Sequence, residues 1–452
     1  MTAPRLILFS IPGLRTKDID KRTTPTLFDW ANRGALAELT PTFPCVTSSV
    51  QASMWTGVGP DRHGVIANGF YHRDRREVEF WVGRNGVIEA EQIWRTLARG
   101  SARRTSAAWH AQNIKDADAD FIVTPEPIHE PDGTTTLWCY SKPVGLYPQL
   151  LDKLGHFPLQ HYWGPMANIE STRWILKAAA WLDQHHRPAF HWVYLPHLDY
   201  ASQKFGPDSP QSRSGLKELD DALTVFQAHL DDMPDGSEPI VLVVGEYALT
   251  DVTGVVFPNR VLREHGLLEV IERDGVENLD MGKSQAFAMV DHQFAHVYVQ
   301  PTLPPAQRRS LAARIVDVFR GVPGMAAVYG EDDRACVGLN HPRSGEVILL
   351  CDDAHWSAYY WWFHDDLAPP FARTVDIHRK PGYDPVELFF DPHTKGIPLD
   401  TSLVKGSHGV PAEEPRHRTA LMCTARGGPV QDGSFHVDRD VKRICLELLG
   451  AI

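Results

Sequence analysis

The sequence predicts an α/β fold in which a central, mostly parallel sheet lies between two layers of helices. Short apolar runs without polar alternation are typical of strands that are buried on both faces. Segments with helical periodicity separate these runs, and such alternation favours a parallel sheet covered on both sides. The predicted strands are Leu6–Ile11, Phe190–Leu195, Ile240–Val244, Ala295–Val299 and Val347–Leu350.

Three helices are predicted between these strands. Apolar residues at spacings of 3, 4, 3 and 4 between Leu216 and Leu230 share one helical face. Ser171–Asp183 forms a second helix, with Ser171 or Thr172 as its N-cap, and a third spans Leu311 to Phe319. Because ligands bind at the carboxyl ends of parallel strands, the loops after residues 11, 195 and 244 should converge.

The chain is predicted to form one domain over residues 1–452. Residues 70–165 are rich in turns and aromatics and could form a cap or insertion over the site. Residues 300–350 resemble a small α/β appendage, and residues 400–452 are expected to return to the core at a helix over Val441–Leu449.

Composition and net charge limit the classes of binding partner that we expect. The 452 residues are 43% hydrophobic, which is ample for a large core, and their net charge is −12. An acidic surface repels nucleic acid polymers and anionic membranes, so neither is an expected partner. An acidic enzyme that acts on phosphate esters needs local positive charge, usually from metal ions.

The six cysteines form no CxxC pair, which predicts free, mostly buried thiols in a reducing compartment. The apolar run before Pro12 is shorter than a signal peptide requires, and it fits a first strand better. No stretch approaches the ~20 apolar residues of a membrane span. These observations predict a cytoplasmic protein.

Residues 40–71 hold the most informative local pattern. Thr47 follows a predicted strand and loop and opens a helix, and Asn68 follows behind Arg62-His63-Gly64. A hydroxyl at a helix N-terminus faces unpaired N–H groups, so it can hold and attack a phosphate or sulfate. The alternative is that Thr47 is simply an N-cap.

This stretch resembles the nucleophile region of the nucleotide pyrophosphatase/phosphodiesterase branch of the alkaline phosphatase superfamily. That branch carries P-x-F-P-x-x-T, a helix ending in T-G, and P-x-x-H-G-[IV]-x-x-N. The matching residues are Phe43, Pro44, Thr47, Thr56, Gly57, Pro60, His63, Gly64, Val65 and Asn68. The resemblance implies an alkaline-phosphatase-like fold, Thr47 as a nucleophile that becomes phosphorylated, and Asn68 as a contact to a phosphate oxygen.

The resemblance also implies two metal ions, usually zinc, but several ligand positions differ. Pro12 stands where the family has an aspartate after the first strand, and proline offers no ligand. In the phrase that ends at Gly206-Pro207, Asp199 matches the family aspartate, and Gln203 replaces a histidine.

The remaining ligand positions lie later in the chain. Glu246 and Tyr247 replace an Asp-His pair, and His408 matches the late histidine of the family. Two ligands are therefore kept, one is changed conservatively and three are lost.

Three hypotheses for the cation site follow. In the first, Asp199, Glu246 and His408 hold one zinc or manganese ion, with His197 as a fourth ligand on the same side of an extended segment as Asp199. In the second, the site is rebuilt from other residues. In the third, no metal is left, and cationic side chains with His408 and the helix start at Thr47 hold an anionic substrate. The candidates for the second hypothesis are Asp291, His292, His296 and His378, and the cationic side chains of the third are Arg379 and Lys380.

The sequence thus favours a hydrolase that cleaves a phosphodiester or pyrophosphate bond in a small anionic ester, using Thr47 and a reduced or rebuilt metal site. Two alternatives remain open. One is a non-hydrolytic enzyme that acts on a specialised metabolite, and the other is a catalytically silent anion- or metabolite-binding protein on the same fold.

Overall fold

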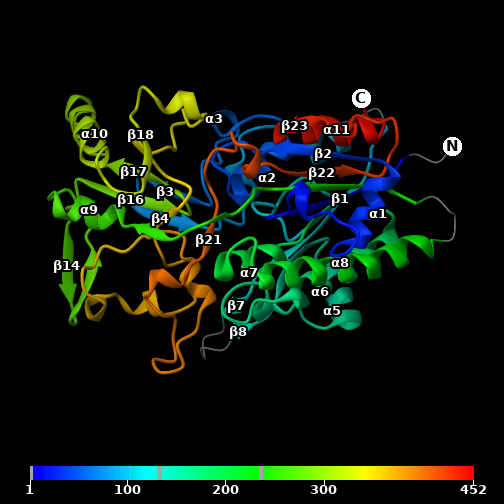
Figure 1. Ribbon diagram of the computed structural model, residues 1–452, viewed down its shortest axis with the longest axis horizontal. Helices are drawn as coiled ribbons and strands as arrows, with labels where there is room; N and C mark the ends of the chain where they lie inside the picture. The colour runs from blue at the N-terminus through cyan, green and yellow to red at the C-terminus, as the bar shows by residue number, and fades with distance from the viewer. Residues whose placement is uncertain (1–3, 101, 130–134, 234–237) are drawn as a thin grey trace.

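Two sheets set the architecture of the computed structural model, which describes residues 4–100, 102–129, 135–233 and 238–452 (Figure 1). The larger sheet has nine strands in the order β23-β2-β22-β11-β1-β10-β5-β6-β9. These strands are β1 (Leu6–Ile11), β2 (Ala35–Thr40), β5 (Ser106–Trp109), β6 (Phe121–Pro125), β9 (Cys139–Lys142), β10 (Phe190–Tyr194), β11 (Ile240–Gly245), β22 (Thr419–Cys423) and β23 (Phe435–Val437).

The centre of this sheet is parallel, as predicted. Strand β1 pairs in parallel with β10 on one side and with β11 on the other. Beyond β10, strand β5 pairs in parallel with both β10 and β6. Strands β22 and β9 pair antiparallel with their neighbours. All six residues of β1 are buried, which explains why its sequence shows no polar alternation.

Helices cover both faces of the sheet, because successive side chains of a strand point to opposite sides. Leu6 and Leu8 of β1 pack with α2 (Thr47–Thr56), α4 (Ile93–Arg99) and α11 (Val441–Leu448). Ile7 and Phe9 pack on the opposite face. The helices of that face are α1 (Pro25–Arg33), α5 (Leu146–Leu154), α6 (Ile169–His186) and α8 (Pro210–Asp231). Figure 1 shows these layers above and below the strands.

A second sheet lies beside the first, at the left of Figure 1. Its four strands are antiparallel, in the order β16-β17-β19-β18. Its elements are β16 (Ala286–Asp291), β17 (Phe294–Val299), β18 (Met325–Tyr329) and β19 (Val347–Cys351), with α9 (Pro258–Glu264) and α10 (Pro305–Phe319). The prediction that the runs 295–299 and 347–350 are parallel was therefore wrong, because an apolar run reads alike in any sheet that is buried on both faces.

The remaining elements are short. They are α3 (Pro60–His63), α7 (His197–Phe205), β3 (Gly69–His72), β4 (Glu77–Phe80), β7 (Ile128–His129), β8 (Thr135–Thr136), β12 (Thr250–Asp251), β13 (Gly254–Val256), β14 (Val270–Arg273), β15 (Val276–Leu279), β20 (His355–Ser357) and β21 (Gly406–Ser407).

Three boundaries differ from the predicted organisation. Residues 70–165 are not a separate cap, since β5, β6 and β9 belong to the main sheet. The appendage expected at 300–350 is part of the larger second sheet, which begins at β16. The C-terminal segment already returns to the core at β22, before α11.

Helix α6 begins at Ile169, and the Asn168 side chain caps it by accepting a hydrogen bond from Glu170 N at 2.9 Å, in place of the predicted Ser171 or Thr172.

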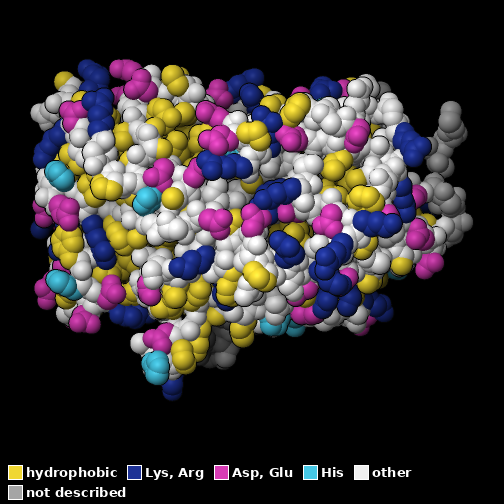
Figure 2. Space-filling model, viewed as in Figure 1, with side chains coloured by type: hydrophobic (Ala, Val, Ile, Leu, Met, Phe, Trp, Pro, Cys, Tyr) yellow, Lys and Arg dark blue, Asp and Glu magenta, His cyan; other side chains and the backbone are white. Residues whose placement is uncertain are grey.

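The surface mixes charges of both signs. Acidic and basic side chains are interspersed on the face shown in Figure 2. All six cysteines are free thiols and five of them are buried, as the sequence predicted. Within the described ranges, the helices are too short or too polar to cross a lipid bilayer.

A buried carboxyl anchors the loop that leads to Thr47. Asp438 accepts hydrogen bonds from Thr42 N at 2.8 Å and from Thr42 Oγ1 at 2.5 Å. Burial raises the pKa of Asp438 from 3.8 to about 6, although these hydrogen bonds act in the opposite direction. The stability that Asp438 contributes is therefore complete below its unfolded pKa and is lost as pH rises through about 6.

We predict that Asp438→Asn, which mimics the neutral carboxyl, gains stability relative to wild type as pH rises. The difference in unfolding free energy should change by about 2 kcal/mol between about pH 4.5 and pH 7. Urea unfolding at both pH values measures it. Asp152→Asn, which alters an exposed carboxyl, is the control and should change stability little. A pH-independent effect of Asp438→Asn would contradict the prediction.

Candidate functional site

The expected loops converge at the carboxyl ends of the central strands. Glu246 and Tyr247 follow β11 directly, and Asp199 lies in α7, which follows β10. The loop after β1 joins them, since Gly13 N donates to the Tyr247 carbonyl at 2.9 Å. Thr47 reaches the same place as the first residue of α2.

Thr47 is not the cap of its helix. Val46 occupies the N-cap position, and no side-chain hydrogen bond caps α2 there. The Thr47 hydroxyl instead lies 3.0 Å from the hydroxyl of Tyr247, and the threonine is only 3% exposed. Its side chain therefore points into the convergence of loops, while α2 directs its first-turn N–H groups to the same region.

Asn68 is held rigidly beside Thr47. Its Oδ1 accepts a hydrogen bond from Ser48 N at 3.0 Å, which satisfies one N–H of the first turn of α2. Asp291, at the end of β16, accepts from Asn68 N at 2.7 Å and from Asn68 Nδ2 at 3.1 Å. The second sheet thus fixes the asparagine that the sequence motif places behind Thr47.

Four aromatic rings stack in a column across the site. The ring centroids of Tyr383 and His292 are 3.6 Å apart, those of His292 and His408 are 3.7 Å apart, and those of His408 and Tyr247 are 3.6 Å apart. Burial lowers the pKa of both histidines well below the ordinary value, so both imidazoles are neutral near pH 7. We call these four residues the ring column.

Two buried carboxyls lie next to the ring column. Asp199 Oδ2 accepts from the Tyr247 hydroxyl at 3.4 Å, and Glu246 Oε1 accepts from Ser10 Oγ at 2.5 Å and from Gln51 Nε2 at 2.7 Å. Burial raises the pKa of Asp199 to about 7 and that of Glu246 to about 8. Their second oxygens, Asp199 Oδ1 and Glu246 Oε2, have no hydrogen-bond partner in the described chain.

One predicted ligand points elsewhere. His197 and Asp199 lie in helix α7 and not in an extended segment, so residues two apart do not share a side. The His197 Nε2 atom pairs with Glu218 Oε2 of α8 at 3.1 Å. The predicted grouping of His197 with Asp199 was wrong, because the segment was read with the period of a strand.

Of the alternative cation-site residues, Asp291 and His292 contact Asn68 and the ring column, and the other four pair with other residues. His296 Nε2 contacts the Ile66 carbonyl at 3.1 Å, and His378 Nδ1 lies 3.3 Å from the Phe80 carbonyl. Lys380 is buried and forms ion pairs with Asp384 and Glu387 at 2.8 and 2.7 Å. Arg379 is largely exposed and lies 3.6 Å from Asp376.

The residues present do not fit the pair of metal ions that the family implies. Among the residues described, no three His, Cys, Asp or Glu side chains are grouped so that one ion could contact them all. Asp199, Glu246 and His408 therefore do not form the expected metal set. The side-chain oxygen of Gln203 already has a hydrogen-bond partner, since it accepts from the Tyr383 hydroxyl at 2.8 Å.

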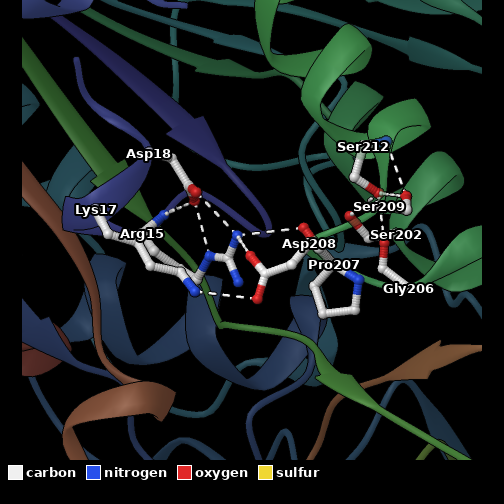
Figure 3. A network of polar contacts seen from close by, with 9 residues as sticks. All are labelled: Arg15, Lys17, Asp18, Ser202, Gly206, Pro207, Asp208, Ser209 and Ser212. Carbon is white, nitrogen blue, oxygen red and sulfur yellow. Dashed lines mark hydrogen bonds and ion pairs between the residues drawn. The ribbon is translucent and has the colours of Figure 1, made fainter.

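An ionic network fixes the loops around the site from outside (Figure 3). Arg15, in the loop after β1, pairs with Asp18 at 2.8 Å and with Asp208 at 2.9 Å, and Lys17 also pairs with Asp208 at 3.1 Å. Asp208 lies between α7 and α8, so the network joins the first loop to the helix that carries Asp199. These charges line a hollow of about 310 Å³, and they pair with one another.

Sequence reasoning missed two contributors to the site. They are Tyr383 and Gln51. Gln51 lies four residues after Thr47, on the same face of α2, and this spacing could have indicated its position. Tyr383 joins the site through long-range stacking, for which the sequence carries no local signal.

The fold and the site define an alkaline-phosphatase-like α/β protein that presents a threonine at a helix start beside a fixed asparagine. The chain belongs to the type I phosphodiesterase / nucleotide pyrophosphatase family, whose family model matches residues 6–384.

Individual relatives are distant. An uncharacterized pyrophosphatase/phosphodiesterase of Schizosaccharomyces pombe is 22% identical over 48% of this chain and 38% of its own length. The bis(5'-adenosyl)-triphosphatase enpp4 of Mus musculus is 25% identical over 49% of this chain and 42% of its own length. The chain thus spans less than half the length of the curated relatives that it matches.

A solved structure supports the fold over the whole chain. Murine ectonucleotide pyrophosphatase/phosphodiesterase 5 has a TM-score of 0.63 at 14% identity, and the match covers 99% of this chain and 95% of that one. A second structure of that murine protein is of an inactive threonine-to-alanine variant in complex with AMP.

We predict that Tyr247→Phe destabilises the fold. The change leaves the buried Thr47 hydroxyl and Asp199 Oδ2 without the hydrogen bonds at 3.0 and 3.4 Å. The unfolding free energy should fall by about 1–3 kcal/mol. Tyr359→Phe is the matched control, because the Tyr359 hydroxyl is buried without a partner in the described chain. Urea unfolding compares the two, and equal effects would contradict the prediction.

Proposed function

We propose that this chain hydrolyses a phosphodiester or phosphoanhydride bond with Thr47 as the nucleophile. The observation that carries the proposal is the Thr47 hydroxyl on the first residue of α2, with Asn68 fixed beside it by Asp291. Membership of the family supports the reaction class. The murine relative whose inactive threonine-to-alanine variant holds AMP supports a nucleotide-like ligand.

The hydrogen bonds around Thr47 suggest a route for its proton. The Thr47 hydroxyl donates to Tyr247 while the Tyr247 hydroxyl donates to Asp199, and a proton moves along this chain as Thr47 Oγ1 attacks phosphorus. The bond from Oγ1 to phosphorus forms, and the bond from phosphorus to the leaving oxygen breaks. The leaving oxygen takes up the released proton, directly or through solvent. Water then attacks the same phosphorus and restores the Thr47 hydroxyl.

Neutral donors would hold the phosphate oxygens. The Asn68 amide nitrogen carries two hydrogens, and Asp291 accepts one of them, so the other can serve the substrate. The remaining N–H groups of the first turn of α2 and the helix dipole would also stabilise the bound phosphate. Donors aimed at the charge that develops in the transition state are the usual source of such stabilisation.

These donors favour a substrate of low charge. The Lys380 ammonium is bound to Asp384 and Glu387, and the imidazoles of His292 and His408 are neutral. Taking a dianionic monoester out of water costs more than taking out a monoanionic diester when no cation pairs with it. We therefore propose a diester or an internal anhydride phosphate as the substrate.

A second candidate function is anion binding without turnover. Two observations favour it: Pro12 and Tyr247 stand at positions where the family carries metal ligands, and the Thr47 hydroxyl is engaged by Tyr247. Such a protein would retain the helix start and Asn68 as a pocket for a nucleotide phosphate.

We predict that purified wild-type protein cleaves bis(p-nitrophenyl) phosphate faster than p-nitrophenyl phosphate, and that Thr47→Ala lowers the diester rate by about 100-fold or more. Release of nitrophenolate measures both rates. Thr47→Ser keeps a hydroxyl at the same place and should retain part of the activity. Equal rates in wild type and Thr47→Ala would remove Thr47 as the nucleophile.

The second candidate gives a different result. Calorimetric titration with AMP would then show binding to wild type, weaker binding to Asn68→Ala because one phosphate donor is lost, and no cleavage of either ester. Turnover that depends on Thr47 excludes a purely binding role.

A further inference from the structure

Three of the four altered ligand positions, Pro12, Glu246 and Tyr247, are adjacent in space. Pro12 precedes Gly13, whose N–H donates to the Tyr247 carbonyl at 2.9 Å, and Glu246 N donates to the Ile11 carbonyl at 3.3 Å. The loops that carry Pro12 and the pair Glu246-Tyr247 are therefore joined through their backbones. The substitutions affect one continuous part of the site.

Tyr247 makes direct contacts to three residues that the family would link through metal ions. Its hydroxyl lies 3.0 Å from Thr47 Oγ1 and donates to Asp199 Oδ2 at 3.4 Å, and its ring stacks on His408 at 3.6 Å with an interplanar angle of 9°. The tyrosine is completely buried. The Tyr247 phenol therefore covers one face of the His408 imidazole and occupies one carboxylate oxygen of Asp199.

The other members of the set are occupied in the same way. Gln203 faces Tyr383, whose ring continues the ring column, and His408 Nδ1 lies 2.7 Å from the Cys45 carbonyl. Asp199 Oδ1, Glu246 Oε2 and His408 Nε2 are left unpaired. Among the described residues, however, no three His, Cys, Asp or Glu side chains are grouped so that one ion could contact them all, whereas zinc sites use at least three protein ligands.

We propose that this chain has replaced the family's pair of metal ions by a fixed hydrogen-bonded cluster in which the Tyr247 hydroxyl contacts Thr47 and Asp199 directly. The inference rests on the same site as the proposed function. Its test measures metal binding and not turnover, so either proposal can fail without the other.

The full-length protein is incubated with excess zinc or manganese, passed through gel filtration and analysed for metal by mass spectrometry. Wild type should retain substoichiometric metal, and zinc should leave its melting temperature unchanged, because a ligand stabilises only a state that it binds. Stoichiometric metal in wild type that is lost in a variant combining Asp199→Ala with His408→Ala would overturn the inference.

A restored variant provides the positive arm. It combines Pro12→Asp, Gln203→His, Glu246→Asp and Tyr247→His, which return the residue types of the family to all four positions. It should bind zinc stoichiometrically and melt at a higher temperature with zinc than without it. Adding Asp199→Ala to the restored variant should weaken that binding.

Circular dichroism checks that the restored variant is folded. A folded restored variant that binds no zinc would overturn the assignment of the change to these four positions. If the combination does not fold, the wild-type metal content and the single change Tyr247→His decide the matter. That single change should raise zinc retention above wild type, and no increase would count against Tyr247 as the residue that excludes metal.

Discussion

A hydrogen bond between two buried hydroxyls, those of Thr47 and Tyr247, holds the site together. It joins the start of α2 to the end of β11 at a separation of 3.0 Å. Both residues are buried, so each hydroxyl would lose a hydrogen-bond partner if the other were removed. The position of the proposed nucleophile is therefore set by a residue two hundred positions away in the chain.

The ring column brings the two sheets together at one point. Tyr247 follows the main sheet, His292 follows β16 of the second sheet, and His408 follows β21. Their rings stack in the ring column, and Asp291 connects that column to Asn68 and to the first turn of α2. The site is rigid because each side chain is fixed by an element from a different part of the chain.

The sequence predicted the parts that depend on local pattern. The apolar runs of β1, β10 and β11 predicted the parallel centre of the sheet, and the resemblance of residues 40–71 to a family motif implied that Asn68 lies near Thr47. It could not predict the side to which His197 points, since that required knowing that the segment is helical. The ring column and the pairing of Lys380 with Asp384 and Glu387 arise from packing between distant segments, which leave no periodic signal.

The buried carboxyls argue that the site has a chemical role and is not merely packed. Burial raises the pKa of Asp199 to about 7 and of Glu246 to about 8, so each is costly to ionise where it stands. Apolar residues of similar size would fill the same space without that cost. Groups with strongly shifted pKa values cluster where proteins move protons or hold polar ligands. Because Asp199 bonds to Tyr247 and Tyr247 to Thr47, the costly carboxyl is connected to the hydroxyl of the first residue of α2.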